Sequence, residues 1–436
     1  MPQPVELPLF SETETGRFPL YDVLRAAHLC LQGKEQTWEA CEYVYRWWSE
    51  CVQLWRELND GSYAVSRYIV FISHWPVVRE IFGSKFRDRV VDTLLMMRVL
   101  PVVDAHFVVD NYSTRKNKGA LFGIWRVYDM IREESCDYTC DCYILKVDIL
   151  SFFVSISKEI AYRLWERFLA AHYEGADCWL ILATIKTILY DCPEQHCIIK
   201  GHISDWQPLP RSKSLLLGSD GRHGLPIGKV VSQVTALLYL DDIDHRLATQ
   251  WHLHHNGHYM DDRVLVGQSE KLLWQVKRWL DAEHEQLELQ THPRKTTLQH
   301  YTKGILFAGA MIMPGRIYVS NRTIGNCFRK LYAFNRRAEN EPGYVEQHAQ
   351  QFAAVMNSYF GLLAHFTEWR MTHRVISSIA PEWYRVMTVV MRHGRYKVEL
   401  RKAYRPQTTA IRRLKDEMDY YFDNNEDHRR SMRLTA

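Results

Sequence analysis

The sequence has no uninterrupted run of 18 apolar residues, so it offers no transmembrane helix. Its first residues, MPQPVELPLFSETETG, lack a basic segment followed by an apolar one, so we expect no secretory signal. The ten cysteines form no paired CxxC units of the kind that bind zinc and no regular disulfide framework. Reduced thiols in an intracellular protein are therefore expected.

The chain also lacks a large excess of charge of either sign. The formal net charge of the 436 residues is only +4, so composition alone does not indicate a nucleic-acid-binding protein. Hydrophobic residues make up 47% of the chain, which is enough for a substantial core in one to three domains. We find no internal repeat and no low-complexity linker.

Hydrophobic periodicity predicts an α+β protein with helical ends. We expect helices over residues 18–59, closed by Gly61, and mostly helix from Asn321 onward. Between them, SRYIVFIS and CYILKVDIL are typical of strands, and residues 191–223 of a long loop with a hairpin. The remaining expected elements are a helix in FRDRVVDTLLMMRVLPVV that ends near Pro101, one helix in SQVTALLYLDDIDHRLATQW, a helix in KLLWQVKRWLDAEHEQL, and a hairpin around Pro314-Gly315.

The stretch GHYMDDRVLVG carries two adjacent aspartates, Asp261 and Asp262, between flanks that favour strands. A solvated turn explains such a pair, because aspartate favours turns. Two part-buried carboxylates about 4 Å apart would repel by roughly 4 kcal/mol, which a divalent cation would offset. Asp148 lies in the other strong strand, so three carboxylates could form a Mg²⁺ site. The pair Asp241-Asp242 lies on a charged helix instead, and we expect it on a solvated face, as we expect for HLHHNGH.

Five ordered blocks resemble those of reverse transcriptases over roughly residues 60 to 310. KVDILSFF resembles the first catalytic block, and HGLPIGKVVSQ resembles the block that contacts the template and the incoming nucleotide. YMDD resembles the YxDD turn, HPRKT the block with a lysine that protonates pyrophosphate, and FAG the hairpin that grips the primer. YxDD alone is not specific, but five blocks in this order are.

The resemblance implies roles for individual residues. The implied metal ligands are Asp148, Ile149, Asp261 and Asp262, and Lys295 would join the three aspartates in catalysis. The implied nucleotide-binding residues are Arg79, Arg115, Lys118, Ile149, Phe153 and Gln233. The implied template- or primer-binding residues are Gly224, Pro226, Ile227, Gly228, Tyr259, Met260, Phe307 and Gly309.

Ordinary structural roles compete with some of these assignments. Phe153 would exclude a 2′-hydroxyl by its bulk, but two phenylalanines beside a strand are also typical of a core. Arg79 and Arg115 suit phosphate contacts, and they equally suit a solvated basic face.

The resemblance further implies a right-hand polymerase fold. Residues 1–60 would form a helical N-terminal extension, 61–140 the fingers, and 141–305 the palm with part of the fingers interleaved. Residues 306–436 would form the primer-grip hairpin, a helical thumb and the C-terminal region.

The implied activity is RNA-directed DNA synthesis with two Mg²⁺ ions, for which Mn²⁺ is a candidate substitute. Its partners would be dNTPs, cDNA and a structured non-coding RNA that serves as template and is a candidate primer. An accessory protein or a second copy of the chain is a further candidate partner, and no membrane is expected. The expected location is the bacterial cytoplasm.

The segment LPIG…SQ is similar to two prokaryotic groups, the diversity-generating retroelements and the defence-associated enzymes. Lys229, Asp92 and Arg263 depart from the diversity-generating pattern, which favours a defence enzyme that copies a dedicated RNA. Ile227 occupies a position that the first group links to miscopying of adenines, so low fidelity is a hypothesis. Two other classes stay open: a catalytically silent RNA-binding scaffold, and a polymerase that works without a template.

Overall fold

The computed structural model describes residues 16–32, 38–74, 77–366 and 368–405. It is an α+β structure with four sheets, and the carboxylate hairpin lies in the four-stranded one. The beginning of the predicted N-terminal extension and the end of the predicted C-terminal region, residues 1–15 and 406–436, lie outside the described residues.

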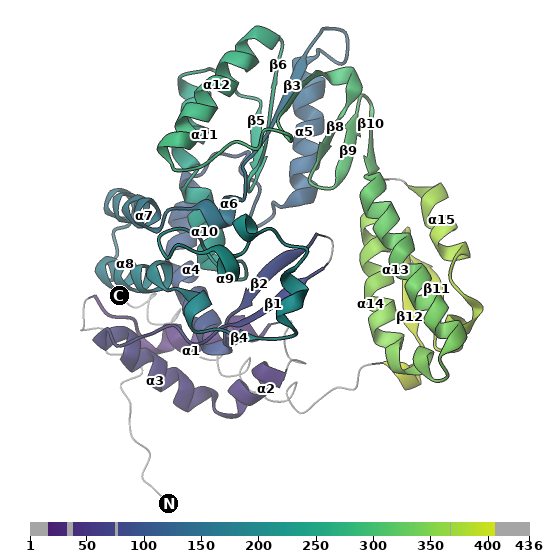
Figure 1. Cartoon of the computed structure of the whole chain (residues 1–436), viewed down its shortest axis with the longest axis horizontal. Coiled ribbons are helices and arrows are strands. Elements are labelled where there is room, and N and C mark those ends of the chain that lie inside the picture. The colour runs from purple at the N-terminus through teal and green to yellow at the C-terminus, as the bar shows by residue number, and fades with distance from the viewer. Residues whose placement is uncertain (1–15, 33–37, 75–76, 367, 406–436) are drawn as a thin grey trace, which may run out of the picture.

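Three helices open the described chain: α1 (Leu20–Leu31), α2 (Trp38–Tyr45) and α3 (Trp47–Asp60). Gly61 ends α3 in the left-handed conformation (φ 77°), as the sequence predicts. α1 packs against α3 and against the long helix α4 (Phe86–His106), so these first helices form a layer beneath the rest of the molecule (Figure 1).

A small sheet follows, in the order β2-β1-β4, from β1 (Ile69–Ser73), β2 (Arg79–Gly83) and β4 (Ile198–Ile199). β4 pairs in parallel with β1, so the hairpin predicted within residues 191–223 is wrong. That segment instead contains η1 (Pro193–Gln195), η2 (Ile203–Trp206), η3 (Arg211–Lys213) and α9 (Leu215–Gly218). The buried carboxylate of Glu80 accepts hydrogen bonds from Trp206 Nε1, at 2.6 Å, and from the Leu215 amide, at 2.7 Å, and so fixes the segment.

Helix α4 does not end near Pro101 but runs through it to His106. An interior proline costs about 3 kcal/mol because it removes a backbone hydrogen bond. The buried side chains of Leu94, Val99 and Val103 lie in the largest hydrophobic core, and their burial outweighs that cost.

The central sheet has the order β5-β6-β3-β7, all antiparallel. Its strands are β3 (Tyr143–Asp148), β5 (Asn256–Tyr259), β6 (Asp262–Gly267) and β7 (Thr297–His300). Successive residues of β3 point to opposite faces: Ile144 packs with the core under α5 (Ala120–Glu134), and Leu145 with the core under α12 (Glu270–Gln286). The sheet is therefore covered on both faces (Figure 1).

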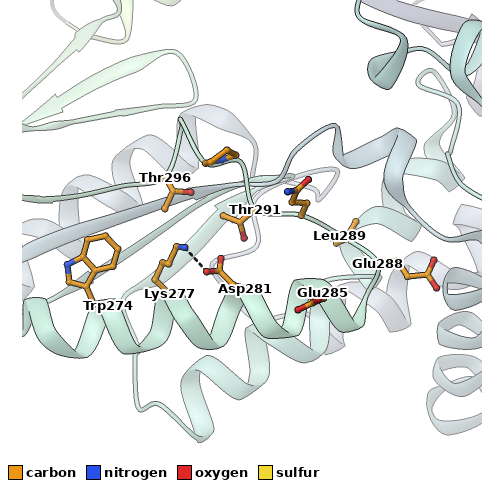
Figure 2. A pocket seen from close by; sticks show the side chains of 10 residues that line it. Trp274, Lys277, Asp281, Glu285, Glu288, Leu289, Thr291 and Thr296 are labelled. Atoms are coloured by element: carbon orange, nitrogen blue, oxygen red, sulfur yellow. Dashed lines mark hydrogen bonds and ion pairs between the residues drawn. The ribbon is translucent and has the colours of Figure 1, made fainter.

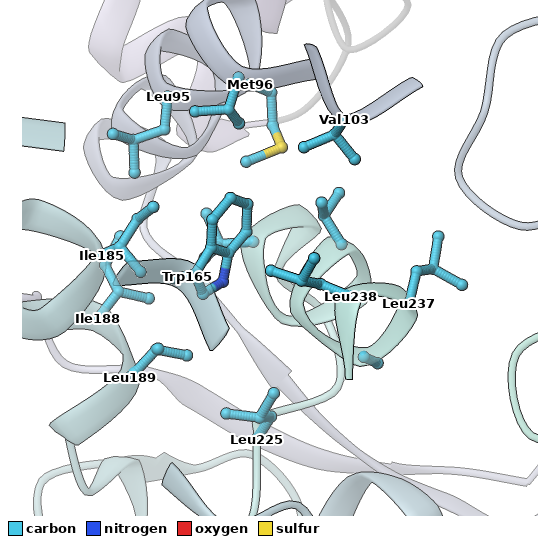
Figure 3. Close-up of a cluster of buried hydrophobic side chains, with 14 of the residues drawn as sticks. Leu95, Met96, Val103, Trp165, Ile185, Ile188, Leu189, Leu225, Leu237 and Leu238 are labelled. Atoms are coloured by element: carbon cyan, nitrogen blue, oxygen red, sulfur yellow. The ribbon is translucent and has the colours of Figure 1, made fainter. Parts of the chain in front are cut away.

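Several further helices share one hydrophobic core with α4, part of which Figure 3 shows. They are α6 (Phe152–Ser155), α7 (Lys158–His172), α8 (Cys178–Tyr190), α10 (Val230–Leu238) and α11 (Asp241–Thr249). Trp165 of α7 lies between α4, α8 and α10, and its indole donates to Thr235 Oγ1 at 2.8 Å. One continuous helix was predicted where α10 and α11 are separate, with Tyr239 and Leu240 between them.

The last described part begins with a sheet in the order β10-β9-β8, from β8 (Ile305–Phe307), β9 (Ala310–Met313) and β10 (Arg316–Val319). The short helix η4 (Tyr301–Lys303) precedes it. A helical body follows, which lies to one side of the molecule (Figure 1). It contains α13 (Asn321–Asn340), α14 (Tyr344–Ala364), α15 (Trp369–Ser377), η5 (Pro381–Arg385) and η6 (Lys402–Tyr404).

A hairpin of β11 (Met387–Arg392) and β12 (Arg395–Leu400) also packs on α14, where the sequence predicted mostly helix. His393 and Gly394 turn the hairpin with positive φ angles. Among the described residues no helix combines the length and the apolar character that crossing a membrane requires.

Candidate active site

The YMDD segment forms a tight turn between β5 and β6, as predicted. Tyr259 pairs with Asp262, so Met260 and Asp261 are the two residues of the turn. Met260 has a positive φ of 56°, which two-residue hairpins require. Its amide donates to Ser113 Oγ at 2.9 Å, and this contact ties the turn to the loop that precedes α5.

The structure brings the three aspartates together. Asp148 is the last residue of β3 and lies directly opposite Asp262 in the antiparallel register, which places their β-carbons about 5 Å apart. Asp261 precedes Asp262 in the turn, and the charge of Asp148 acts on both. The side chain of Asp148 is only 10% exposed, and that of Asp262 is 22% exposed.

Two lysines face these carboxylates. Lys295 Nζ lies 3.0 Å from both carboxylate oxygens of Asp148. Lys146 Nζ lies 2.9 Å from Asp262 Oδ2 and also donates to the carbonyl of Leu306 at 2.6 Å. Lys146 occupies the same face of β3 as Asp148, two residues earlier.

Burial destabilises the charged form of these carboxylates. Burial, together with the charges of Asp148 and Asp262, raises the pKa of Asp261 to about 6. Burial also raises the pKa of Asp262, although Lys146 opposes the change. Asp262 Oδ1 is buried with no hydrogen-bond partner among the described residues. A site that has a surplus of buried oxygen ligands, one of them unsatisfied, fits a hard divalent cation.

The HGLPIGKVVSQ block lies between the central sheet and the small β1–β2 sheet. The amides of Gly224 and Leu225 donate to the carbonyls of Ile156 and Phe153, both at 2.8 Å, and the Phe82 amide donates to the Ile227 carbonyl at 2.9 Å. Gly224 and Gly228 have positive φ angles, and a β-carbon at Gly228 would lie 2.5 Å from the carbonyl oxygen of Phe82. These approaches require glycine.

The other residues of this block differ in exposure. Pro226 is buried, Ile227 is half-buried and Gly228 is exposed. Phe153 is half-buried on α6, and its ring contacts the fully buried Phe152 edge to face. Ile149, next to Asp148, is buried.

Gln233 lies on α10, and its Oε1 accepts from Thr114 Oγ1 at 3.0 Å. The loop that carries Thr114 is STRKNKG, which supplies two of the predicted phosphate contacts. The structure thus brings the nucleotide-binding residues predicted on two distant segments into one place.

The predicted phosphate-binding cations have different surroundings. Arg79 is exposed at the start of β2. Arg115 is 7% exposed, pairs with Asp104 and donates to the carbonyls of Val108 and Asn111. It would have to leave these acceptors to hold a triphosphate, so the structure favours a supporting role for Arg115. Lys118 donates to the carbonyl of Val109 in the same loop.

The predicted primer hairpin is β8–β9, turned by Ala308 and Gly309, which both have positive φ. Gly309 is exposed, and its carbonyl accepts from the Ser320 amide at 3.0 Å. Phe307 is fully buried against Tyr112, so the primer contact predicted for it is not available to its side chain. Tyr259 is half-buried at the end of β5.

Two expectations about solvated segments are wrong in part, although His252 and His254 are exposed as expected. His258 of the HLHHNGH segment is buried, and its Nε2 lies 2.8 Å from Asp244 Oδ2 while its Nδ1 lies 3.0 Å from the Met260 carbonyl oxygen. Asp241 is also buried, although Asp242 is exposed. Helical periodicity explains the pair, because adjacent residues on a helix point in different directions.

Sequence reasoning missed the roles of Lys146, Asp244 and His258. The alternation of β3 could have identified Lys146, because a charge two residues before Asp148 must share its face. No local pattern links Asp244 to His258, which meet only through the packing of α11 against β5.

A hollow of about 690 Å³ lies between α12 and residues 288–296 (Figure 2). Its wall includes the acidic residues Asp281, Glu285 and Glu288, and Lys277 is paired with Asp281 at 2.5 Å. None of the three clustered aspartates lines it, and its acidic wall repels phosphates. We therefore do not place the chemistry there.

Comparison with known proteins agrees with this geometry. Residues 79–312, more than half of the chain, match the family described as "Reverse transcriptase (RNA-dependent DNA polymerase)". The chain belongs to the reverse transcriptase family. Its fold is the polymerase fold of that family. Enzymes of this family use divalent metal ions. No curated protein matches the chain.

Solved structures with a similar backbone include telomerases from two Candida species. Apo telomerase from Candida tropicalis, truncated from the C-terminal domain, is 11% identical over 59% of this chain and 55% of that one, with a TM-score of 0.40. Telomerase from Candida albicans with a TWJ fragment of telomeric RNA is 10% identical over 74% of this chain and 57% of that one, with the same TM-score. The chain thus spans little more than half the length of these structures. Similarity this low carries no information about substrates.

Proposed function

We propose that Asp148, Asp261 and Asp262 bind two Mg²⁺ ions and that this site joins dNTPs to a primer while it copies an RNA template. One observation carries the proposal: three carboxylates from two strands and a turn converge, and one buried oxygen of Asp262 has no hydrogen-bond partner among the described residues. Bound metal ions would stabilise the charge that develops on the transferred phosphoryl group. Ile149 would complete the ligand set.

The surrounding residues would bind and orient the substrates. Lys295, whose ammonium group donates to Asp148, would be the cation nearest to the leaving pyrophosphate and would protonate it. Phe153 would face the sugar of the incoming nucleotide, while Gln233, Arg79 and Lys118 would contact the nucleotide.

The template and the primer would follow two other surfaces. The turn of Gly224, Pro226, Ile227 and Gly228 would face the template base pair, since its glycines permit a close backbone approach. Tyr259, Met260 and the exposed Gly309 turn would face the primer end. The helical body after Asn321 would act as the thumb and follow the phosphates of the RNA–DNA duplex.

Substitution of one carboxylate tests the metal site. Asp261→Asn should lower primer extension on an RNA template by more than a hundredfold, while RNA affinity in a filter-binding assay stays unchanged. Asp242→Asn is the matched control, because the Asp242 side chain on α11 is exposed. Extension by Asp261→Asn at a tenth of the wild-type rate or more would contradict the proposed role.

The template class is tested separately. Each dNTP alone and all four together should be offered to the enzyme with an RNA, with the matching DNA, and with neither. Products that require the RNA and carry its complement support RNA-templated synthesis. Products of one dNTP without a template would establish template-independent extension, and RNA binding without any product would establish a silent scaffold.

For the biological setting, we propose a dedicated structured RNA of a bacterial anti-phage system as the template. Support comes from the LPIG…SQ block together with the departures at Asp92, Lys229 and Arg263 from the diversity-generating pattern. Sequencing of the nucleic acid that co-purifies from the native host identifies the RNA and its primer. Phage plating with wild type and Asp261→Asn then tests the defence role.

Ile227 supports the alternative, a mutagenic enzyme of a diversity-generating retroelement. In that case sequenced cDNA should carry errors at template adenines in excess of the other three bases. Equal error rates at all four bases would contradict this alternative and leave the proposed anti-phage role.

A further inference from the structure

A cluster of imidazoles and one carboxylate lies where α4 and α7 end and α11 begins, apart from the three clustered aspartates. His106 is the last residue of α4, and His172 is the last residue of α7. Asp241 begins α11, and His245 follows one turn later on the same face. No role in nucleotide addition accounts for these residues.

The distances between the side chains are those of a ligand set. Asp241 Oδ2 lies 2.8 Å from His106 Nε2, and Asp241 Oδ1 lies 3.5 Å from His245 Nε2. Taking one ligand atom from each residue, all three atoms lie within 4.8 Å of one another. Two atoms bound at about 2.05 Å to a tetrahedral ion lie about 3.3 Å apart, which the two distances bracket.

Two of these atoms lack the hydrogen bonds that a metal-free cluster would need. Asp241 Oδ1 and His245 Nε2 are both buried, and neither has a hydrogen-bond partner among the described residues. The side chain of Asp241 is 9% exposed, so water does not replace the missing partner freely. A buried carboxylate oxygen without a partner costs free energy that a shared cation would recover.

We propose that His106, Asp241 and His245 bind one Zn²⁺ ion. Nitrogen ligands together with one carboxylate suit zinc and exclude Mg²⁺, which takes oxygen ligands. The ring of His172 lies 4.5 Å from that of His106 and is the nearest further imidazole for a fourth position. The ion would fasten the end of α4 to the start of α11, and α11 carries Asp244, which contacts the catalytic hairpin through His258.

Metal content of the purified full chain tests the site. After dialysis against about 1 µM Zn²⁺, elemental analysis should find one zinc per chain, and His245→Ala and Asp241→Asn should bind it at least about tenfold more weakly. Three variants should keep the zinc: His254→Ala, an exposed histidine; Cys136→Ser, an exposed cysteine; and Asp261→Asn, which alters the proposed Mg²⁺ site.

Two further measurements keep the test independent of folding and of activity. Circular dichroism should show His245→Ala folded, because this side chain is partly exposed. Co²⁺ in place of Zn²⁺ should give a visible absorption band of the wild type that His245→Ala lacks. Wild type without zinc after this dialysis, or zinc retained equally by Asp241→Asn and His245→Ala, would overturn the site. Loss of the metal in Cys136→Ser alone would assign it to the cysteines instead.

Discussion

Arg263 and Asp244 form a buried ion pair at 2.6 Å behind the turn that carries Asp261 and Asp262. Arg263 also donates to Asn256 Oδ1 at 2.8 Å, and Asp244 takes His258 as its second partner. Burial opposes the charge of Asp244, but Arg263 and His258 outweigh it and hold the pKa of this carboxyl at about 2. The arginine after YMDD is therefore part of the support of the catalytic hairpin.

Asp244→Asn should lower the free energy of unfolding by about 3 kcal/mol or more, since it leaves the buried guanidinium without a counter-charge. It should also slow primer extension more than it weakens RNA binding, because the turn loses its support. Denaturant titration and steady-state kinetics measure the two effects. Asp242→Asn, on the exposed side of the same helix, should change neither.

Lys229 and Asp92, two departures from the diversity-generating pattern, lie 3.4 Å apart in the core, and Lys229 is fully buried. Each single substitution, Lys229→Met or Asp92→Leu, should cost about 3 to 5 kcal/mol because it leaves an unpaired buried charge. The double variant should cost much less than the sum of the two. A double-mutant cycle by chemical denaturation measures this coupling, and additive costs would contradict it.

Phe153→Ala should admit ribonucleotides, since a half-buried ring would no longer occupy the space of a 2′-hydroxyl. The ratio of kcat/KM for dNTP to that for rNTP should fall by at least about tenfold. Phe152→Leu is the control, because that buried neighbour packs in the core and should affect stability alone. An unchanged preference in Phe153→Ala would remove the assignment.

His284 gives the protein an acid-sensitive component of stability. Burial, with help from the charge of Arg263, lowers its pKa to about 4 from 6.5. The unfolded chain therefore binds a proton before the folded chain does, so stability is complete above pH 6.5 and is lost as pH falls toward 4. This group should account for about 2 kcal/mol between pH 7 and pH 5. Urea titrations at both pH values should show the loss in wild type and in His254→Gln, but not in His284→Gln.

The proposed thumb role predicts that individual basic side chains contribute to the salt dependence of duplex binding. Arg322 is exposed in the first turn of α13, directly after the segment that Gly309 contacts. Arg322→Ala should weaken binding of an RNA–DNA duplex and lower the slope of log affinity against log salt by about one. Arg337, which is paired with Glu341, should behave as the control. Equal slopes for wild type and Arg322→Ala would place the duplex elsewhere.

The sequence predicted the parts of the fold that local patterns determine. The continuous apolar run CYILKVDIL and the turn at Met260-Asp261 specify β3 and the β5–β6 hairpin, and Gly61 specifies the end of α3. The predicted end of α4 near Pro101 was wrong, because the packing of α4 in the core outweighs the preference of proline to end a helix. The β11–β12 hairpin was missed although His393-Gly394 is a turn signal, because the basic residues around it also suit an exposed helix.

The candidate site also has parts that local sequence patterns predicted and parts that only the packing shows. The three aspartates were predicted because each lies in a recognisable block. Lys295, which pairs with Asp148, was also predicted. The other buried ion pairs were not predicted, because Lys146, Lys229 and Asp244 meet their counter-charges across 116, 137 and 19 positions of sequence. Phe307 and Arg115 are buried, which removes their side chains from the predicted primer and phosphate contacts. Periodicity alone does not reveal this burial.

Lys146 holds Asp262 and the Leu306 carbonyl with one ammonium group. The side chain of Lys146 thereby links β8, the strand that leads into the Gly309 turn, to Asp262 in the central sheet. Since the proposed thumb begins only after β10, movements of this helical body need not alter that spacing. The distance between the clustered aspartates and the β8–β9 hairpin would then be the same for the growing DNA end in every cycle of nucleotide addition, whatever position the helical body has adopted.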